Sequence, residues 1–201
     1  MNSEKNGTSA FFALVLRQKY ITRWGLMRNA MPENLAQHSS ECAIIAHALA
    51  TVGNRVFGKN YDVGKITVMA LFHDVPEVFT GDMPTPVKYA NETIRRQFGE
   101  IERQSTQGLL DKLPDILKPD YGSIFAAMET DRESERILKA ADRLCAYIKC
   151  LEEEKYGNSE FRSAKETIKK KIDESGCEES EYFIRHFLPA FGMTLDEQQK
   201  L

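Results

Sequence analysis

The sequence predicts an all-α protein that forms a single domain over residues 1–201. Apolar residues recur at helical spacing in one segment after another, and residues 62–80 are the clearest example. Asn34 and Gln37 have the spacing of a capping box, which marks the start of a helix. The chain contains no convincing strand, internal repeat or linker between domains, so its elements are expected to be helices and short loops.

Composition excludes several classes of protein. Apolar residues make up 42% of the chain, enough for a buried core, and the mean hydropathy of −0.44 excludes a membrane-embedded protein. No apolar run reaches the roughly 18 residues of a transmembrane helix, and residues 1–7 lack the pattern of a signal peptide. A net charge of −3 argues against a general nucleic-acid binder. Reduced core thiols of a cytoplasmic protein are the expected state of Cys42, Cys145, Cys150 and Cys177.

The first two predicted helices flank the only tryptophan. Residues 9–19 form a short amphipathic pattern, and the less regular residues 20–29 follow, with Arg23 beside Trp24. Without further context, the simplest interpretation of this pair is a packing Trp with a solvated Arg. The next helix is predicted over residues 34–55.

The helix over residues 34–55 carries two histidines with different expected roles. His38 lies in its first turn, on the face that includes Cys42, and is a candidate metal ligand. His47 lies nine residues further on, roughly 180° around the helix, so the two side chains cannot bind the same ion. We expect His47 to be a packing or surface residue.

The next predicted helix begins with Asp62 as its N-cap and ends before Gly81. It carries His73 directly before Asp74, and together an imidazole and a carboxylate can bind a divalent metal. Glu77 lies one turn beyond His73 on the same face, whereas Asp74 is rotated by about 100° and must reach the ion from the side. A lone His-Asp pair is more often only a hydrogen-bonded pair, so further ligands are needed.

Residues 81–88 contain one Gly and two Pro and predict a stiff loop that is not a regular element. Because this loop leaves the helix that carries His73, it is expected at the rim of the site, where loops often carry binding groups. The alternative is a plain connector between helices. The following helix is predicted over residues 91–112, with an inward face made of Ile94, Phe98, Ile101 and Leu109.

A carboxylate within an apolar stripe provides the third clue to a site. The helix predicted over residues 131–156 begins at a second capping-box pair, Thr130 and Glu133, and carries Asp142 among apolar residues. A carboxylate in that position is costly unless it is paired, hydrogen-bonded or bound to a metal. The remaining helices are predicted over residues 121–128, 160–175 and 180–188.

The order His38, His73-Asp74, Asp142 is the signature of the HD-domain phosphohydrolases, which this chain resembles. From about residue 11 to residue 195 it is similar to the bacterial 5′-deoxynucleotidases of that superfamily. The motifs that carry this closer match are Arg23-Trp24 with Arg28-Asn29, Glu33-Asn34-x-x-x-His38-Ser39, His73-Asp74-x-x-Glu77, the loop Thr80-Gly81-Asp82-x-Pro84-Thr85-Pro86-Val87-Lys88-Tyr89, and Lys139-x-x-Asp142-x-Leu144-Cys145-Ala146-Tyr147.

The resemblance implies an HD-domain helical bundle, usually a homodimer, that removes the 5′-phosphate from deoxyribonucleoside 5′-monophosphates. It implies a divalent metal such as Co²⁺, Mn²⁺ or Cu²⁺, and Glu77 matches the catalytic Glu of the family. The implied metal ligands are His38, His73, Asp74 and Asp142. The implied substrate-binding residues are Arg23, Trp24, His38, Asp74, Asp82, Met83, Pro84, Thr85 and Asp142.

Two departures from the family pattern lie near these residues. Ala36-Gln37 precedes His38 where Ser-Glu is expected, and Pro76 within His-Asp-x-x-Glu is expected to kink the helix or remove a backbone bond. Three other interpretations stay open. The HD scaffold also hydrolyses cyclic nucleotides and (p)ppGpp. A second alternative is a nucleotide-binding sensor without catalysis. A third is a structural dimerisation module, in which the pattern of metal ligands is a coincidence.

Overall fold

The structure, a computed structural model, describes residues 7–88 and 90–201. Within these residues the regular elements are helices, apart from one isolated antiparallel bridge between Thr22 and Asn34, so the all-α prediction is confirmed. The described helices include none that is long and apolar enough to cross a membrane. The signal-peptide prediction concerned residues 1–7, and all but the last of these lie outside the described residues, as does Tyr89 of the loop motif.

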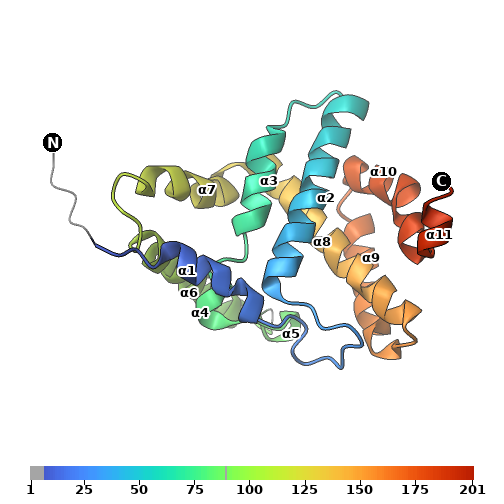
Figure 1. The fold of residues 1–201 in the computed structure, drawn as a ribbon, viewed down its shortest axis with the longest axis horizontal. Coiled ribbons are helices and arrows are strands. Elements are labelled where there is room, and N and C mark those ends of the chain that lie inside the picture. Colours follow the sequence, from blue (N-terminus) through green and yellow to red (C-terminus); the bar gives the residue numbers. More distant parts are fainter. Residues whose placement is uncertain (1–6, 89) are drawn as a thin grey trace.

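Three helices form the centre of the molecule: α2 (Leu35–Val56), α3 (Val63–Phe72) and α8 (Arg132–Lys155). Figure 1 shows α2 and α3 side by side, with α8 crossing them. Their facing sides build the main core from small and aliphatic residues, which lets the helix axes approach closely. The four cysteines are free and buried, three of them in this core, as predicted.

A smaller apolar cluster lies beneath the turn that follows α3. Val75 of that turn is fully buried against Phe11 of α1 (Phe11–Val15), Leu109 of α6 (Glu92–Leu110) and the helix α7 (Lys118–Thr130). This packing fixes the backbone of the turn, and the side chains of residues 73, 74 and 77 are thereby held in place.

The remaining elements are short or lie toward the C-terminus. In Figure 1 the helices α9 and α10 lie on the side of the molecule away from α1 and α6, where α9 packs along α8 and α10 packs mainly against α2. These elements are η1 (Leu16–Tyr20), α4 (Glu77–Thr80), α5 (Thr85–Lys88), η2 (Ser159–Phe161), α9 (Arg162–Asp173), α10 (Glu178–His186), η3 (Leu188–Gly192) and α11 (Leu195–Gln198).

The predicted helix starts are confirmed to within about three residues: the helix predicted from residue 121 begins at residue 118, and the one predicted from residue 180 begins at residue 178. Asn34 and Gln37 form the predicted capping box. The cap of α8 is Asp131, whose side chain accepts the backbone N–H of Ser134, so the pair Thr130 and Glu133 does not form a box. The Thr130 hydroxyl donates instead to the preceding turn of α7.

Two further expectations are corrected. Ile101, predicted to face inward, is 45% exposed, because α6 covers only the small cluster and buries Phe98 and Leu109. Residues 81–88 are not all loop: Thr85 to Lys88 form the one-turn helix α5, in which a proline in the first turn lacks only an N–H that has no partner there. Asp62 and Gly81 act as the predicted helix start and stop.

The predicted helix over residues 62–80 is broken. The helix α3 ends at Phe72, and tight turns follow over residues 73–76: the N–H groups of Val75 and Glu77 donate to the carbonyls of the residues three positions back, Phe72 and Asp74. Pro76 is the N-cap of α4, which begins at Glu77, and Gly81 is its C-cap, with φ of 74°. The interruption expected from Pro76 is therefore present, and Glu77 begins a separate helix.

Candidate metal centre and substrate site

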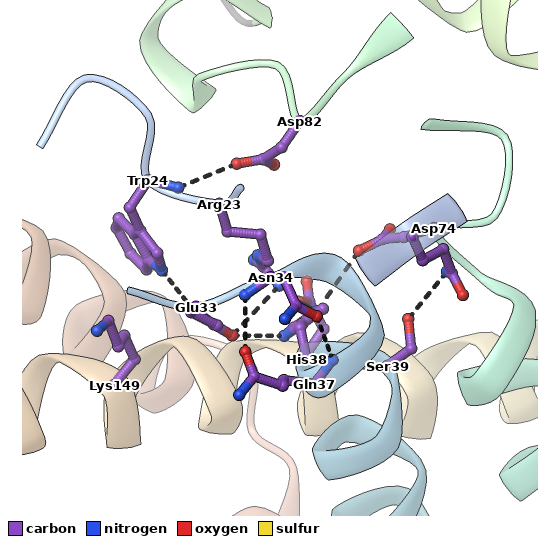
Figure 2. A network of polar contacts seen from close by, with 12 residues as sticks. Arg23, Trp24, Glu33, Asn34, Gln37, His38, Ser39, Asp74, Asp82 and Lys149 are labelled. Carbon is purple, nitrogen blue, oxygen red and sulfur yellow. Dashed lines mark hydrogen bonds and ion pairs between the residues drawn. The ribbon is translucent and has the colours of Figure 1, made fainter. Parts of the chain in front are cut away.

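Four ligand-type side chains converge between α2, α8 and the turn after α3, and we call them the metal centre (His38, His73, Asp74 and Asp142). His38 Nε2 lies 3.2 Å from Asp142 Oδ1 and 3.5 Å from Asp74 Oδ2. His73 Nε2 lies 3.1 Å from the same Asp74 oxygen. The predicted ligands are therefore neighbours, although they come from three separate segments, and Figure 2 shows His38 and Asp74 facing each other.

The imidazole nitrogens that face this centre have no hydrogen bond to any residue that the structure describes. His38 Nε2 and His73 Nε2 are buried and unpaired, because the nearby carboxylate oxygens lie off the direction that a hydrogen bond requires. The other nitrogen of each ring has a partner: His73 Nδ1 lies 2.7 Å from the carbonyl oxygen of Ala70, and His38 Nδ1 lies 3.5 Å from Glu33 Oε1. Such outer partners orient a ligand histidine, so this donor set fits a divalent cation.

The imidazoles and carboxylates of the metal centre shift one another's pKa values, because they lie close together. Burial alone would lower the pKa of His73, but Asp74 raises it to about 9. Burial would raise the pKa of Asp74, but the charge of His73 lowers it to about 2. The pKa of Asp142 is also lowered, because His38 outweighs the effect of burial. A cation that binds here must displace protons from imidazoles whose charged form is stabilised by the nearby carboxylates.

Cys42 on α2 is a rival ligand that the sequence pattern did not suggest. Single ligand atoms of His38, Cys42 and His73 lie within 4.8 Å of one another. A metal binds the thiolate, and a hydrogen bond with Cys145 together with burial raises the pKa of Cys42 well above its ordinary value. The neighbouring carboxylates are ionised already, so they are the better ligands.

Arg23 places a buried positive charge beside the metal centre. Its side chain is 12% exposed, and its Nε and Nη1 atoms have no hydrogen-bond partner among the described residues. Burial alone would lower the pKa of Arg23, but the surrounding carboxylates outweigh this effect, Asp142 and Glu33 most strongly, and the pKa is raised overall. A permanently charged guanidinium with unpaired N–H groups can bind the oxygens of an anionic substrate such as a phosphate.

Trp24 is held in an unusual backbone conformation by three contacts. Its φ of 57° is the one positive φ of a residue other than Gly in the described chain. Its backbone N–H donates to Asp82 Oδ2 at 3.2 Å, its indole Nε1 donates to Glu33 Oε2 at 2.9 Å, and its ring packs against Phe161. Figure 2 shows Trp24 between Asp82 and Glu33. The indole is therefore a fixed surface beside Arg23.

The loop residues predicted to bind substrate differ in their contacts. Asp82 joins the Trp24 segment by the hydrogen bond already described. Met83 and Pro84 are half-buried, and Thr85 is exposed at the start of α5. Lys88 at the end of α5 donates to Glu102 of α6 at 2.6 Å, which fixes this end of the loop.

Glu77 is a buried carboxyl group near the metal centre. It is 8% exposed, and its Oε2 atom is buried without a hydrogen-bond partner within residues 7–88 and 90–201. Burial, followed by repulsion from Asp74 and Asp82, raises the pKa of Glu77 to about 9. At neutral pH and without a metal the group is therefore protonated. A carboxyl with a pKa this far from its ordinary value is suited to carry a proton in catalysis.

Glu33 was not assigned a role from the sequence, yet it contacts three predicted site residues. One oxygen lies 3.5 Å from His38 Nδ1 and 4.0 Å from Arg23 Nη1, and the other accepts the hydrogen bond of Trp24. The only sequence signal was its place directly before Asn34, the N-cap of α2, within a motif of the family resemblance.

Comparisons with known proteins agree on one family. The model of the YfbR-like 5′-deoxynucleotidases matches residues 10–191. A 5′-deoxynucleotidase of Pectobacterium atrosepticum is 44% identical over 189 residues, which cover 94% of this chain and 95% of that protein. A 5′-deoxynucleotidase of Shewanella oneidensis is 42% identical over 193 residues, which cover 96% of this chain and 99% of the relative.

Solved structures agree on the fold. An HD-domain phosphohydrolase from Listeria innocua superposes with a TM-score of 0.80 at 23% identity, covering 94% of this chain and 91% of that one. An HD phosphohydrolase of cyanophage S-2L, solved with dA and one catalytic Zn²⁺ ion, has a TM-score of 0.52 at 23% identity and covers 69% of each chain. At these identities the likeness establishes the HD-domain fold, which confirms the predicted bundle.

Proposed function

Since the chain belongs to the YfbR-like 5′-deoxynucleotidase family of the HD-domain phosphohydrolases, we propose that its metal centre holds one divalent cation that serves this reaction. The chain is a metal-dependent 5′-deoxynucleotidase, a hydrolase whose substrates are deoxynucleotides. The observation that carries the proposal is the pair of buried, unpaired nitrogens, His38 Nε2 and His73 Nε2, that face the Asp74 carboxylate.

The chemistry divides between the cation and the side chains around it. A bound divalent cation neutralises a phosphoryl oxygen and lowers the pKa of a bound water. Arg23 is proposed to bind the non-bridging phosphate oxygens with its unpaired Nε and Nη1 groups, and so to orient the phosphorus. The phosphate dianion would then be the hydrogen-bond partner of the Arg23 guanidinium, in place of the surrounding carboxylates.

Glu77 is proposed to carry the proton of the reaction. Hydrolysis forms a bond between the water oxygen and phosphorus and breaks the bond between phosphorus and the nucleoside 5′-oxygen. One proton passes from the water to that 5′-oxygen. Glu77 Oε2 is buried and has no competing hydrogen bond in the described part of the chain, so it can take up and release this proton.

The ion itself is tested by phosphate release from metal-stripped protein. We expect no release from dAMP until Co²⁺, Mn²⁺, Cu²⁺ or Zn²⁺ is added, and full activity at about one ion per chain. Zn²⁺ is included because the cyanophage relative in fold was solved with one catalytic Zn²⁺. Full activity of the stripped protein without any added ion would contradict the proposal. The homodimer stays a prediction.

Trp24 is proposed to form the wall that excludes the 2′-hydroxyl of ribonucleotides. A hydroxyl pressed against an apolar ring loses its water and gains no partner, which costs about 1–3 kcal/mol, or roughly tenfold to a hundredfold in relative rate. The fixed indole beside Arg23 has the rigidity that such a wall requires. Asp82 is proposed to accept a hydrogen bond from the 3′-hydroxyl, which both sugars share.

Trp24→Ala is expected to narrow the ratio of kcat/KM between dAMP and AMP by about tenfold or more, with little change in preference among bases. Asp82→Asn is the matched variant, because its amide oxygen can still accept the N–H of Trp24. It is expected to lower kcat/KM for both sugars together. A folded, active Trp24→Ala enzyme with the selectivity of the wild type would show that discrimination arises elsewhere.

A further inference from the structure

We propose that Glu33 is a positioning residue that couples the sugar-facing Trp24 to the metal ligand His38. The inference rests on the proposed function and adds a residue that it does not use. One carboxylate would then fix the orientation of two rings: the indole that selects the sugar and the imidazole that binds the cation.

The two oxygens of Glu33 have separate partners. Oε2 accepts the hydrogen bond of Trp24 Nε1 at 2.9 Å, and Oε1 lies 3.5 Å from His38 Nδ1. The side chain is 11% exposed, so water competes little for either oxygen. Figure 2 shows Glu33 between the indole and the imidazole, with both contacts drawn. Arg23 Nη1, at 4.0 Å from Oε1, balances the charge of the carboxylate.

The backbone holds Glu33 and Trp24 in register. The N–H of Arg23 donates to the carbonyl of Glu33 at 3.0 Å, and the N–H of Leu35 donates to the carbonyl of Ile21 at 2.9 Å. These two hydrogen bonds hold the ends of the segment 21–35 together. A non-glycine residue in the left-handed region costs on the order of 1–3 kcal/mol, so the conformation of Trp24 needs such support.

The far side of the same segment is fastened to α8. The N–H groups of Ala30 and Met31 donate to the two oxygens of Glu153 at 2.8 and 3.1 Å, and Glu153 is fully buried. The segment is therefore anchored at both ends. A change at Glu33 is expected to move the indole and the imidazole locally without releasing the whole segment.

The consequence for His38 concerns which nitrogen carries its proton. A carboxylate at Nδ1 accepts the Nδ1 proton, and this leaves Nε2 free to bind a cation. Outer partners of this kind change metal affinity by roughly 10- to 100-fold when removed. The consequence for Trp24 is different: without an acceptor for Nε1, the ring loses its fixed orientation and the sugar wall loosens.

The test measures metal affinity and sugar selectivity on the same set of variants. Metal-free protein is titrated with Co²⁺ alone by calorimetry, and kcat/KM for dAMP and AMP is measured at saturating Co²⁺. Glu33→Ala is expected to weaken Co²⁺ binding by roughly 10- to 100-fold and to narrow the dAMP-to-AMP ratio. Trp24→Phe keeps a ring but lacks the indole N–H, so it should narrow the ratio and leave Co²⁺ affinity within about twofold of the wild type.

Two further variants keep the result decisive. Glu33→Gln is nearly isosteric and has a single acceptor oxygen, so it must lose one of the two contacts and change at least one readout, even if Glu33→Ala does not fold. Glu41→Gln is the matched control, because it removes a carboxylate of α2 within electrostatic range of His38 that has no hydrogen bond to His38 or Trp24 among the described contacts. It should change neither readout.

The outcomes separate this inference from the proposed function. If the wild type binds one Co²⁺ and folded Glu33→Gln matches it in both affinity and selectivity, Glu33 does not couple the two residues, while the metal centre stands. If the wild type binds no Co²⁺, the metal centre fails and the inference fails with it. A uniform loss of stability and activity in Glu33→Gln, with both readouts unchanged, would show a purely structural role.

Discussion

Replacing Asp74 by Asn is expected to abolish stoichiometric metal binding and to lower phosphate release by roughly a thousandfold. Asp74 Oδ2 lies between both imidazoles, 3.1 Å from His73 Nε2 and 3.5 Å from His38 Nε2. An amide keeps the shape but removes the negative charge that a hard or borderline cation requires. A metal ion contributes several kcal/mol to the stabilisation of a transition state, and each 1.36 kcal/mol is a factor of ten in rate.

Cys42→Ser provides the matched control for this experiment. If the carboxylates are the ligands, Cys42→Ser should retain about one ion per chain and near wild-type turnover, because a serine fills the same buried space without a thiolate. Elemental analysis of the purified variants and calorimetric titration of the stripped proteins measure this directly. If Cys42→Ser loses the ion while Asp74→Asn keeps it, the ligand set is His38, Cys42 and His73.

The positions of the metal-centre residues were predictable because each has a local signal. His38 follows a capping box, His73 and Asp74 close an apolar helix, and Asp142 interrupts an apolar stripe. Helical periodicity places such residues on inward faces, and the core then brings the faces together. The same logic found the central helices to within a few residues.

Features that depend on distant contacts were not predictable. The role of Glu33 arises from Trp24, nine residues earlier, and from His38 on the next helix turn, and no period in the sequence links these residues. The left-handed backbone of Trp24 is likewise set by Asp82, which is far away in the chain. Ile101 has the spacing of an inward residue, but it is 45% exposed, because the contacts of α6 with α1, α4, α5 and α7 do not cover its full apolar stripe.

The arrangement of the site lowers the stability of the metal-free protein, and Glu77 is the clearest case. Its pKa rises from an ordinary value of 4.5 to about 9, because of burial and the nearby charges of Asp74 and Asp82. Between these pH values the folded state binds a proton that the unfolded state has released. The free energy of unfolding therefore falls as pH rises across this window, by up to about 1.4 kcal/mol per pH unit from this group. Such a cost is typical of residues kept for function.

Glu77→Gln is expected to lower kcat by roughly a hundredfold or more while it keeps the metal ion, because an amide cannot carry the proton. The same change should stabilise the metal-free protein, and the gain over the wild type should be larger at pH 8 than at pH 5. Denaturant unfolding in the presence of a chelator measures the gain, and Co²⁺ titration measures the retained site. Glu129→Gln, at an exposed position of α7, is the surface control and should alter neither quantity. A folded Glu77→Gln variant with wild-type kcat, or one that is less stable at pH 8 than at pH 5 relative to the wild type, would make Glu77 a structural residue and leave the proton to another group.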